Sequence, residues 1–126
     1  MRKKWQGFLR KAYRAVKKLS EVLSIVRNLK LLQCAECAEG IKYWLKANGI
    51  NGIHLQLKLV GRGYFIVSQR WEEGRTPITQ NGTHYGIEVR RKVFDNLSMI
   101  GLTREEWIKD FDCPSGQFIV EEIDRF

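Results

Sequence analysis

The chain has 126 residues, 44% of them hydrophobic, which is the size of a single domain that can bury its own core. It contains three cysteines, two of them only three positions apart, which argues against a disulfide framework and favours a reducing compartment. Lysines and arginines interrupt every apolar run near the N-terminus, and no window reaches the roughly 18 apolar residues of a membrane-spanning helix. These features predict a soluble, cytoplasmic chain with no signal peptide and no transmembrane segment.

The net charge of +8 is concentrated at the N-terminus. Residues 1–30 hold ten Lys/Arg and one Glu, a balance of +9, whereas residues 31–126 hold 12 basic and 13 acidic side chains, a balance of −1. Apolar residues recur at steps of three and four through 1–30, which predicts a basic amphipathic helix distinct from a domain over 31–126. This helix either packs on the domain with its charged face in solvent, or contacts nucleic acid, a membrane or an acidic partner.

The domain is predicted to begin with a helix and a hairpin. Apolar residues on one face and a following Asn-Gly stop predict a helix from Cys34 to Ala47. Alternation between apolar and polar residues over 53–59 predicts a half-buried strand, with His54 on its solvent face. A turn at 61–63 then predicts a hairpin with a second strand over 64–68.

A loop and a second strand pair are predicted next. Residues 69–82 contain a proline and several glycines with little periodicity, so we expect a loop that borders a site. Strands are expected over 84–90 and 93–96, joined by a tight turn at Arg90-Arg91. If the turn has two residues, residue 86 faces residue 95 across the pair.

The C-terminal part is predicted to contain a short helix and a last strand. Thr103-Arg104-Glu105-Glu106 has the pattern of a capping box, and the helix after it would carry Trp107 and Phe111 one turn apart. Residues 112–116 end that helix, and 117–123 reads as a strand. Because the strands are clustered, we expect an α+β fold in which N-terminal helices pack on a mostly antiparallel sheet.

Candidate catalytic residues follow from this layout. Cysteine reacts as the thiolate, which a helix N-terminus and a nearby imidazole both favour, and Cys34 is placed at a helix start. Of the two histidines His54 is predicted to point outward, which leaves His84 as the base. Asp95 would orient His84, because the predicted register places the two as diagonal neighbours on one face of the sheet.

Three segments carry a resemblance to a known family. The patterns Gln33-Cys34-Ala35-Glu36-Cys37-Ala38, Gly82-Thr83-His84-Tyr85-Gly86-Ile87 and Val93-Phe94-Asp95-Asn96 resemble the papain-fold toxin domains of bacterial polymorphic toxin systems. The chain is most similar to the second papain-fold toxin group, which is well represented in cyanobacteria. A later Gly-Leu-Thr-Arg-Glu-Glu-Trp stretch adds to the resemblance, which spans about residues 31–126.

The resemblance implies a papain-like fold and a Cys-His-Asp triad that acts on an amide or related acyl bond. The expected activity is that of a peptidase, deamidase or acyltransferase, without a cofactor, in a toxin or effector domain. Such a domain would act on a protein substrate, could be neutralised by an immunity protein, and could be delivered into the cytoplasm of a target cell.

Within that resemblance, Cys34 or Cys37 would attack the carbonyl, His84 would carry the proton and Asp95 would hold His84. Papain peptidases have a Cys-x-x-Cys pair with the second cysteine as nucleophile, which favours Cys37. We prefer Cys34, because Gln33 adjoins it as an amide residue adjoins the nucleophile in related folds. Gln33, together with backbone N–H groups at the helix start, would then stabilise the oxyanion by hydrogen bonds.

Three other interpretations stay open. Cys34 and Cys37 could be two buried structural thiols. Together with His84 and Cys113 they could instead form a closed structural zinc site. The chain could also be a non-catalytic binding module that uses the basic residues 1–30.

Overall fold

The computed structural model describes residues 34–126, apart from the side chains of Ser98 and Met99. The predicted basic helix over 1–30 and the predicted oxyanion residue Gln33 lie outside the described residues. Within 34–126, no helix is long and apolar enough to cross a membrane.

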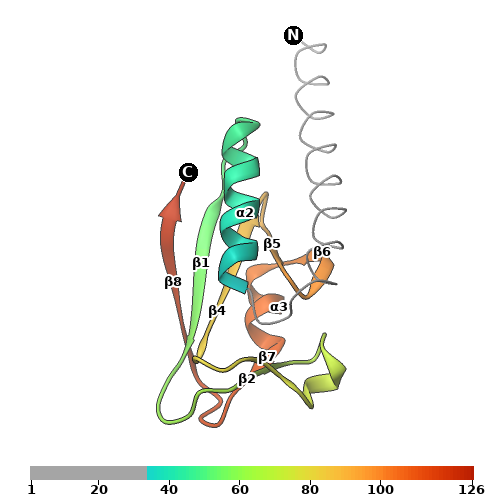
Figure 1. Cartoon of the computed structure of the whole chain (residues 1–126), viewed down its shortest axis with the longest axis vertical. Helices are drawn as coiled ribbons and strands as arrows, with labels where there is room; N and C mark the ends of the chain where they lie inside the picture. The colour runs from blue at the N-terminus through green and yellow to red at the C-terminus, as the bar shows by residue number, and fades with distance from the viewer. Residues whose placement is uncertain (1–33) are drawn as a thin grey trace.

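The structure is α+β, with two antiparallel sheets and two helices in the described residues (Figure 1). One sheet has five strands in the order β6-β5-β4-β1-β8, and the other has three in the order β3-β2-β7. The elements in chain order are α2 (Cys34–Ala47), β1 (Ile53–Leu59), β2 (Ile66–Ser68), the 3₁₀ turn η1 (Glu72–Gly74), β3 (Pro77–Thr79), β4 (Thr83–Val89), β5 (Lys92–Asp95), β6 (Ser98–Leu102), α3 (Arg104–Lys109), β7 (Phe111–Asp112) and β8 (Phe118–Arg125). The predicted fold class, a helix packed on mostly antiparallel sheet, is confirmed.

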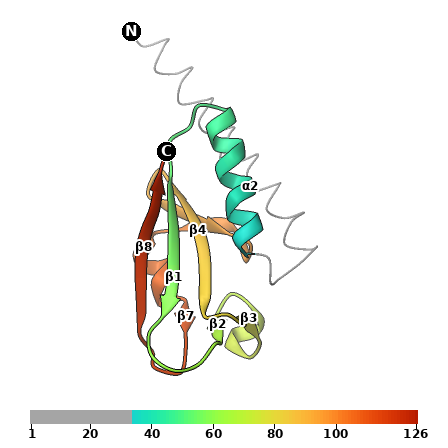
Figure 2. The same ribbon diagram turned by 60° about the vertical axis from the view of Figure 1, so that its left-hand side comes forward.

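Side chains cover both faces of the five-stranded sheet. On one face, the apolar side of α2 packs against β4 and β5, and Figure 2 shows this helix running along the sheet. On the other face, leucines of β1 pack in a second core with the side chain of Trp107 from α3. Burial of apolar surface on both faces holds the layers together.

His54 is buried, and its predicted outward position is wrong. The residue is 2% exposed, because α2 covers the face of β1 on which it lies. Its ring packs edge-on against Tyr85 at 5.6 Å and lies 3.8 Å from a carboxylate oxygen of Glu39. The predicted strand is present as β1, but alternation does not tell whether the polar face of a strand is covered by another layer.

The predicted hairpin between residues 53–59 and 64–68 does not form. Both edges of β1 are occupied, by β4 and β8, so β2 has no place beside it and pairs instead with β3 and β7. The segment 69–82, predicted to be a loop, contains the turn η1 and the strand β3. Phe111, predicted to lie in the short helix, starts β7 because that helix ends at Lys109.

The hairpin of β4 and β5 has the predicted two-residue turn. Arg90 and Arg91 both have positive φ, 54° and 66°, as a tight hairpin turn of the primed type requires. The pairing of Ile87 with Phe94 continues the register in which residue 86 faces residue 95. The capping box at the start of α3 is also present, with Thr103 and Glu106 bonded reciprocally.

Gly86 of β4 lies in close contact with Trp107 of α3. A Cβ at this position would lie 2.7 Å from Cγ1 of Val93 and 2.9 Å from Cζ2 of Trp107. A side chain here would therefore push the indole away from the sheet.

We predict that Gly86→Ala lowers the free energy of unfolding by about 1–3 kcal/mol, because the added methyl overpacks the contact with Trp107. Urea denaturation measures this change. The matched control is Gly40→Ala on the exposed face of α2, where nothing lies within 4 Å of the added Cβ. The control should gain about 0.5–1 kcal/mol from helix propensity. Equal effects of the two substitutions would contradict the steric argument.

Candidate active site

Cys34 lies in the first described turn of α2, next to the start of β4. Its side chain is buried, and Sγ lies 3.9 Å from the carbonyl oxygen of Thr83, the residue before His84. The helix therefore places this thiol over the strand that carries the predicted base. The unpaired N–H groups of a first helical turn favour a negative charge at such a position.

His84 is fixed by the carboxylate of Asp95. His84 Nε2 lies 3.0 Å from Oδ2 of Asp95, and both side chains are completely buried. A carboxylate accepts but does not donate, so the proton of the neutral ring resides on Nε2 and Nδ1 is its acceptor. Nδ1 is buried and makes no hydrogen bond of ordinary geometry in the described residues.

The surroundings of His84 favour the protonated ring. Burial alone would lower its pKa, but the hydrogen bonds and charges of Asp95 and Cys34 outweigh burial and raise the pKa to about 9. Cys34 therefore lies close to the ring of His84. A cysteine beside an imidazole is the pairing on which cysteine nucleophiles depend.

Asp95 itself is held as a carboxylate by several donors. Its Oδ2 also accepts a hydrogen bond from Nε1 of Trp107 at 2.9 Å, and its Oδ1 accepts one from the backbone N–H of Leu97 at 3.1 Å. Arg70 forms an ion pair with the same carboxylate at 2.7 Å. Burial alone would raise the pKa of Asp95, but the hydrogen bonds and charges of His84 and Arg70 hold this pKa well below its usual value.

Cys37, the alternative nucleophile, lies one turn further along α2 and packs in the core. Burial raises the pKa of its thiol to about 12, with further contributions from the charges of Asp95 and Cys34. Cys37 therefore stays protonated at neutral pH and behaves as a small apolar side chain. Cys34, in contrast, is the cysteine that acts on the ring of His84.

The structure does not bring Cys113 to the other cysteines. Its Sγ contacts Gln117 O at 3.4 Å and Ser115 Oγ at 3.5 Å in the turn between β7 and β8. Across residues 34–126, no three His, Cys, Asp or Glu side chains are placed to hold a metal ion. The proposed zinc ligands Cys34, Cys37, His84 and Cys113 thus do not assemble into a site.

Two residues that contact the site were missed in the sequence. Arg70 was assigned to a featureless loop, and no local pattern connects it to Asp95, which lies 25 positions away. Trp107 was recognised as part of a helix, but sequence spacing gives no indication that its indole N–H points to Asp95. Both contacts depend on how separate elements pack.

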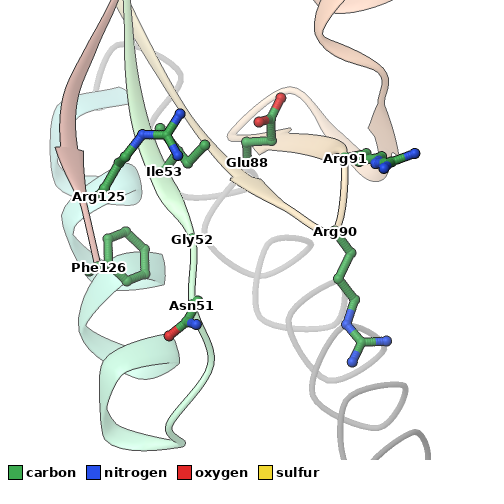
Figure 3. Close-up of a pocket in the computed structure, with 8 residues that line it drawn as sticks. All are labelled: Asn51, Gly52, Ile53, Glu88, Arg90, Arg91, Arg125 and Phe126. Carbon is green, nitrogen blue, oxygen red and sulfur yellow. The ribbon is translucent and has the colours of Figure 1, made fainter.

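A cavity of about 420 Å³ lies at the other end of β4, away from His84 (Figure 3). Its lining residues are Asn51, Gly52, Ile53, Glu88, Arg90, Arg91, Arg125 and Phe126. The side chains of Arg90 and Arg91 point away from Arg125 in Figure 3, so the three guanidinium groups do not converge on one ligand. None of the three predicted catalytic residues lines this cavity.

Comparison with models of protein families gives a match that covers most of the chain. The model of a family described as papain fold toxin 2 matches residues 17–112, which is more than half of the chain. The matched stretch contains Cys34, His84 and Asp95, and it begins within the segment 1–30 that was predicted to be separate. No curated protein and no solved structure matches the chain.

We predict that iodoacetamide at pH 7.5 modifies Cys37 of the native protein at least about tenfold more slowly than the half-buried Cys113, because the thiol of Cys37 is buried and protonated. Mass spectrometry of the digested protein measures each cysteine separately. Unfolding in urea should abolish the difference. Rapid modification of Cys37 in the folded protein would contradict its assignment to the core.

Proposed function

The chain belongs to the papain fold toxin 2 family, and we propose that it is a cysteine hydrolase with Cys34 as nucleophile and His84 as acid and base. Asp95 orients His84. The observation that carries the proposal is the buried contact between Nε2 of His84 and Oδ2 of Asp95, which leaves Nδ1 for the thiol. This is the arrangement of nucleophile, base and orienting acceptor that acyl transfer requires.

In the first half of the proposed reaction, the Cys34 thiolate attacks the carbonyl carbon of an amide. The carbonyl π electrons move to oxygen and form an oxyanion. The His84 imidazolium then donates its Nδ1 proton to the leaving nitrogen as the C–N bond breaks, and a thioester remains on Cys34. Asp95 keeps the ring in place and stabilises its positive charge before the transfer.

In the second half, His84 Nδ1 accepts a proton from water while the water oxygen attacks the thioester. The C–S bond breaks, the acid is released, and the thiolate and imidazolium are restored. A peptide bond as substrate makes the chain a peptidase, and a side-chain amide makes it a deamidase that releases ammonia. Replacement of water by an amine makes it an acyltransferase.

Backbone N–H groups in the first turn of α2 are our proposed donors to the oxyanion, because a first helical turn has N–H groups without intrahelical partners. The side chain of Gln33 stays a predicted second donor. The proposed substrate is a protein in the cytoplasm of a target cell, with an immunity protein as the natural inhibitor. A toxin of this kind should stop growth only when its nucleophile is intact.

We predict that induced expression of the wild-type chain arrests bacterial growth, and that Cys34→Ala and His84→Ala abolish the arrest. Asp95→Asn should weaken it strongly, because loss of an orienting carboxylate costs about 10⁴-fold in well-studied triads. Growth curves at matched expression levels measure the effect.

Cys37→Ala is the matched control, since it alters a cysteine on the same helix and should retain toxicity. Circular dichroism of the purified variants shows whether each one is folded. Full toxicity of folded Cys34→Ala would reject the enzyme and would favour a binding module that uses residues 1–30.

A further inference from the structure

Arg70 connects the two sheets at the carboxylate of Asp95. It follows β2 of the three-stranded sheet, whereas Asp95 ends β5 of the five-stranded sheet. Nη1 of Arg70 donates to Oδ1 of Asp95 at 2.8 Å, and Nη2 donates to Oδ2 at 2.7 Å. The guanidinium therefore grips both carboxylate oxygens in the planar two-pronged geometry that is specific to arginine.

The guanidinium is itself held on its remaining sides. Nε donates to Oδ2 of Asp110 at 2.8 Å, and the hydroxyl of Ser68 donates to the same oxygen. The backbone N–H of Arg70 donates to Oγ of Ser68 at 3.1 Å. The guanidinium carbon also lies 5.6 Å from the ring centre of Phe111, whose ring packs 5.0 Å from that of His84. A side chain fixed at this many points loses little further freedom when it grips Asp95.

This grip controls the direction in which Asp95 presents its oxygens. His84 and Trp107 contact only Oδ2, and the backbone N–H of Leu97 contacts only Oδ1. Arg70 is the one side chain among these donors that binds both oxygens, so it restricts rotation of the carboxylate about the bond to its Cβ. Small displacements of an orienting group reduce catalysis sharply, because the base must be aligned with the reacting proton.

We propose that Arg70 is a positioning residue, which holds the Asp95 carboxylate in the plane where Oδ2 meets His84 Nε2. The three-stranded sheet then contributes to the site, because Arg70 directly follows its strand β2 and contacts the carboxylate of Asp95. This inference rests on the proposed function of Cys34, His84 and Asp95.

The charge of Arg70 also affects the imidazole of His84, because it helps to keep Asp95 ionised. The titratable and charged groups described around Asp95 and His84 are Arg70, Asp110, Cys34 and Cys37, with the indole N–H of Trp107 as a neutral donor. Arg70 is the permanent cation of this set. Without it, the buried Asp95 takes up a proton at higher pH. A protonated Asp95 no longer stabilises the His84 imidazolium, which disfavours the proposed thiolate and imidazolium pair at acid pH.

The test is the pH dependence of Cys34 alkylation by iodoacetamide in the full chain, followed by mass spectrometry that separates Cys34 from Cys37. For the wild type we expect the alkylation rate of Cys34 to decrease when the pH drops below a defined value, which we call the acid limit. In Arg70→Met this limit should rise by on the order of one pH unit. Arg70→Lys keeps the charge but has no two-pronged grip, so it should show a smaller rise and a several-fold lower maximal rate.

Arg104→Met is the matched control. Arg104 also binds both oxygens of a carboxylate, that of Glu88 in β4, with Nε to Oε2 at 3.0 Å and Nη2 to Oε1 at 2.8 Å, but it makes no contact with Asp95 or His84 among those described. The acid limit should not move in this variant. If Arg70 has only a structural role, both Arg70→Met and Arg104→Met should lower the stability of the protein, and neither should shift the acid limit of Cys34 alkylation.

A folded Arg70→Met protein with the wild-type acid limit would overturn the inference. If Arg70→Met does not fold, Arg70→Lys decides: a folded Arg70→Lys protein with the wild-type limit and maximal rate would equally overturn it. Failure of the proposed function looks different, because wild-type Cys34 would then react no faster than Cys113 and would show no acid limit below neutral pH.

Discussion

The arrangement of the site depends on the buried carboxylate of Asp95. Donors reach it from four parts of the chain: His84 of β4, Trp107 of α3, Arg70 after β2, and the backbone of Leu97 after β5. A carboxylate with no exposed side-chain surface is costly unless charge and hydrogen bonds compensate for the lost water. Asp95 therefore ties the two sheets and α3 together at the point where the proposed chemistry occurs.

This carboxylate also distinguishes the two neighbouring cysteines. Asp95 raises the pKa of His84, and the imidazolium so favoured lies beside Cys34. The same negative charge, together with burial, raises the pKa of Cys37 to about 12. Two thiols on one face of one helix thus have different environments, because one is next to the imidazole and the other is in the core between α2 and the sheet.

Local patterns predicted the parts of the site that depend on neighbouring residues. The two-residue turn at Arg90-Arg91 and the parity of β4 and β5 were sufficient to place His84 and Asp95 on one face. The helix stop after Ala47 and the capping box at Thr103 were readable for the same reason.

Features that depend on packing between distant elements were not predicted. Alternation along β1 could not show that α2 buries His54, and the turn after β1 could not show that its edges are taken by β4 and β8. For this reason the sequence did not predict the three-stranded sheet, nor the contact between Arg70, which follows β2, and Asp95. An arginine in a glycine-containing segment gives no local sign of the carboxylate it will grip.

The most direct test of the account is the titration of His84 by ¹⁵N NMR of its imidazole ring. If Asp95 holds the ring beside the Cys34 thiolate, the pKa of His84 should be raised to about 9, so that the imidazolium persists through neutral pH and is lost only as the pH approaches that value. Asp95→Asn should lower the value. A wild-type His84 that titrates near 6.5, or stays neutral at pH 7, would contradict the account.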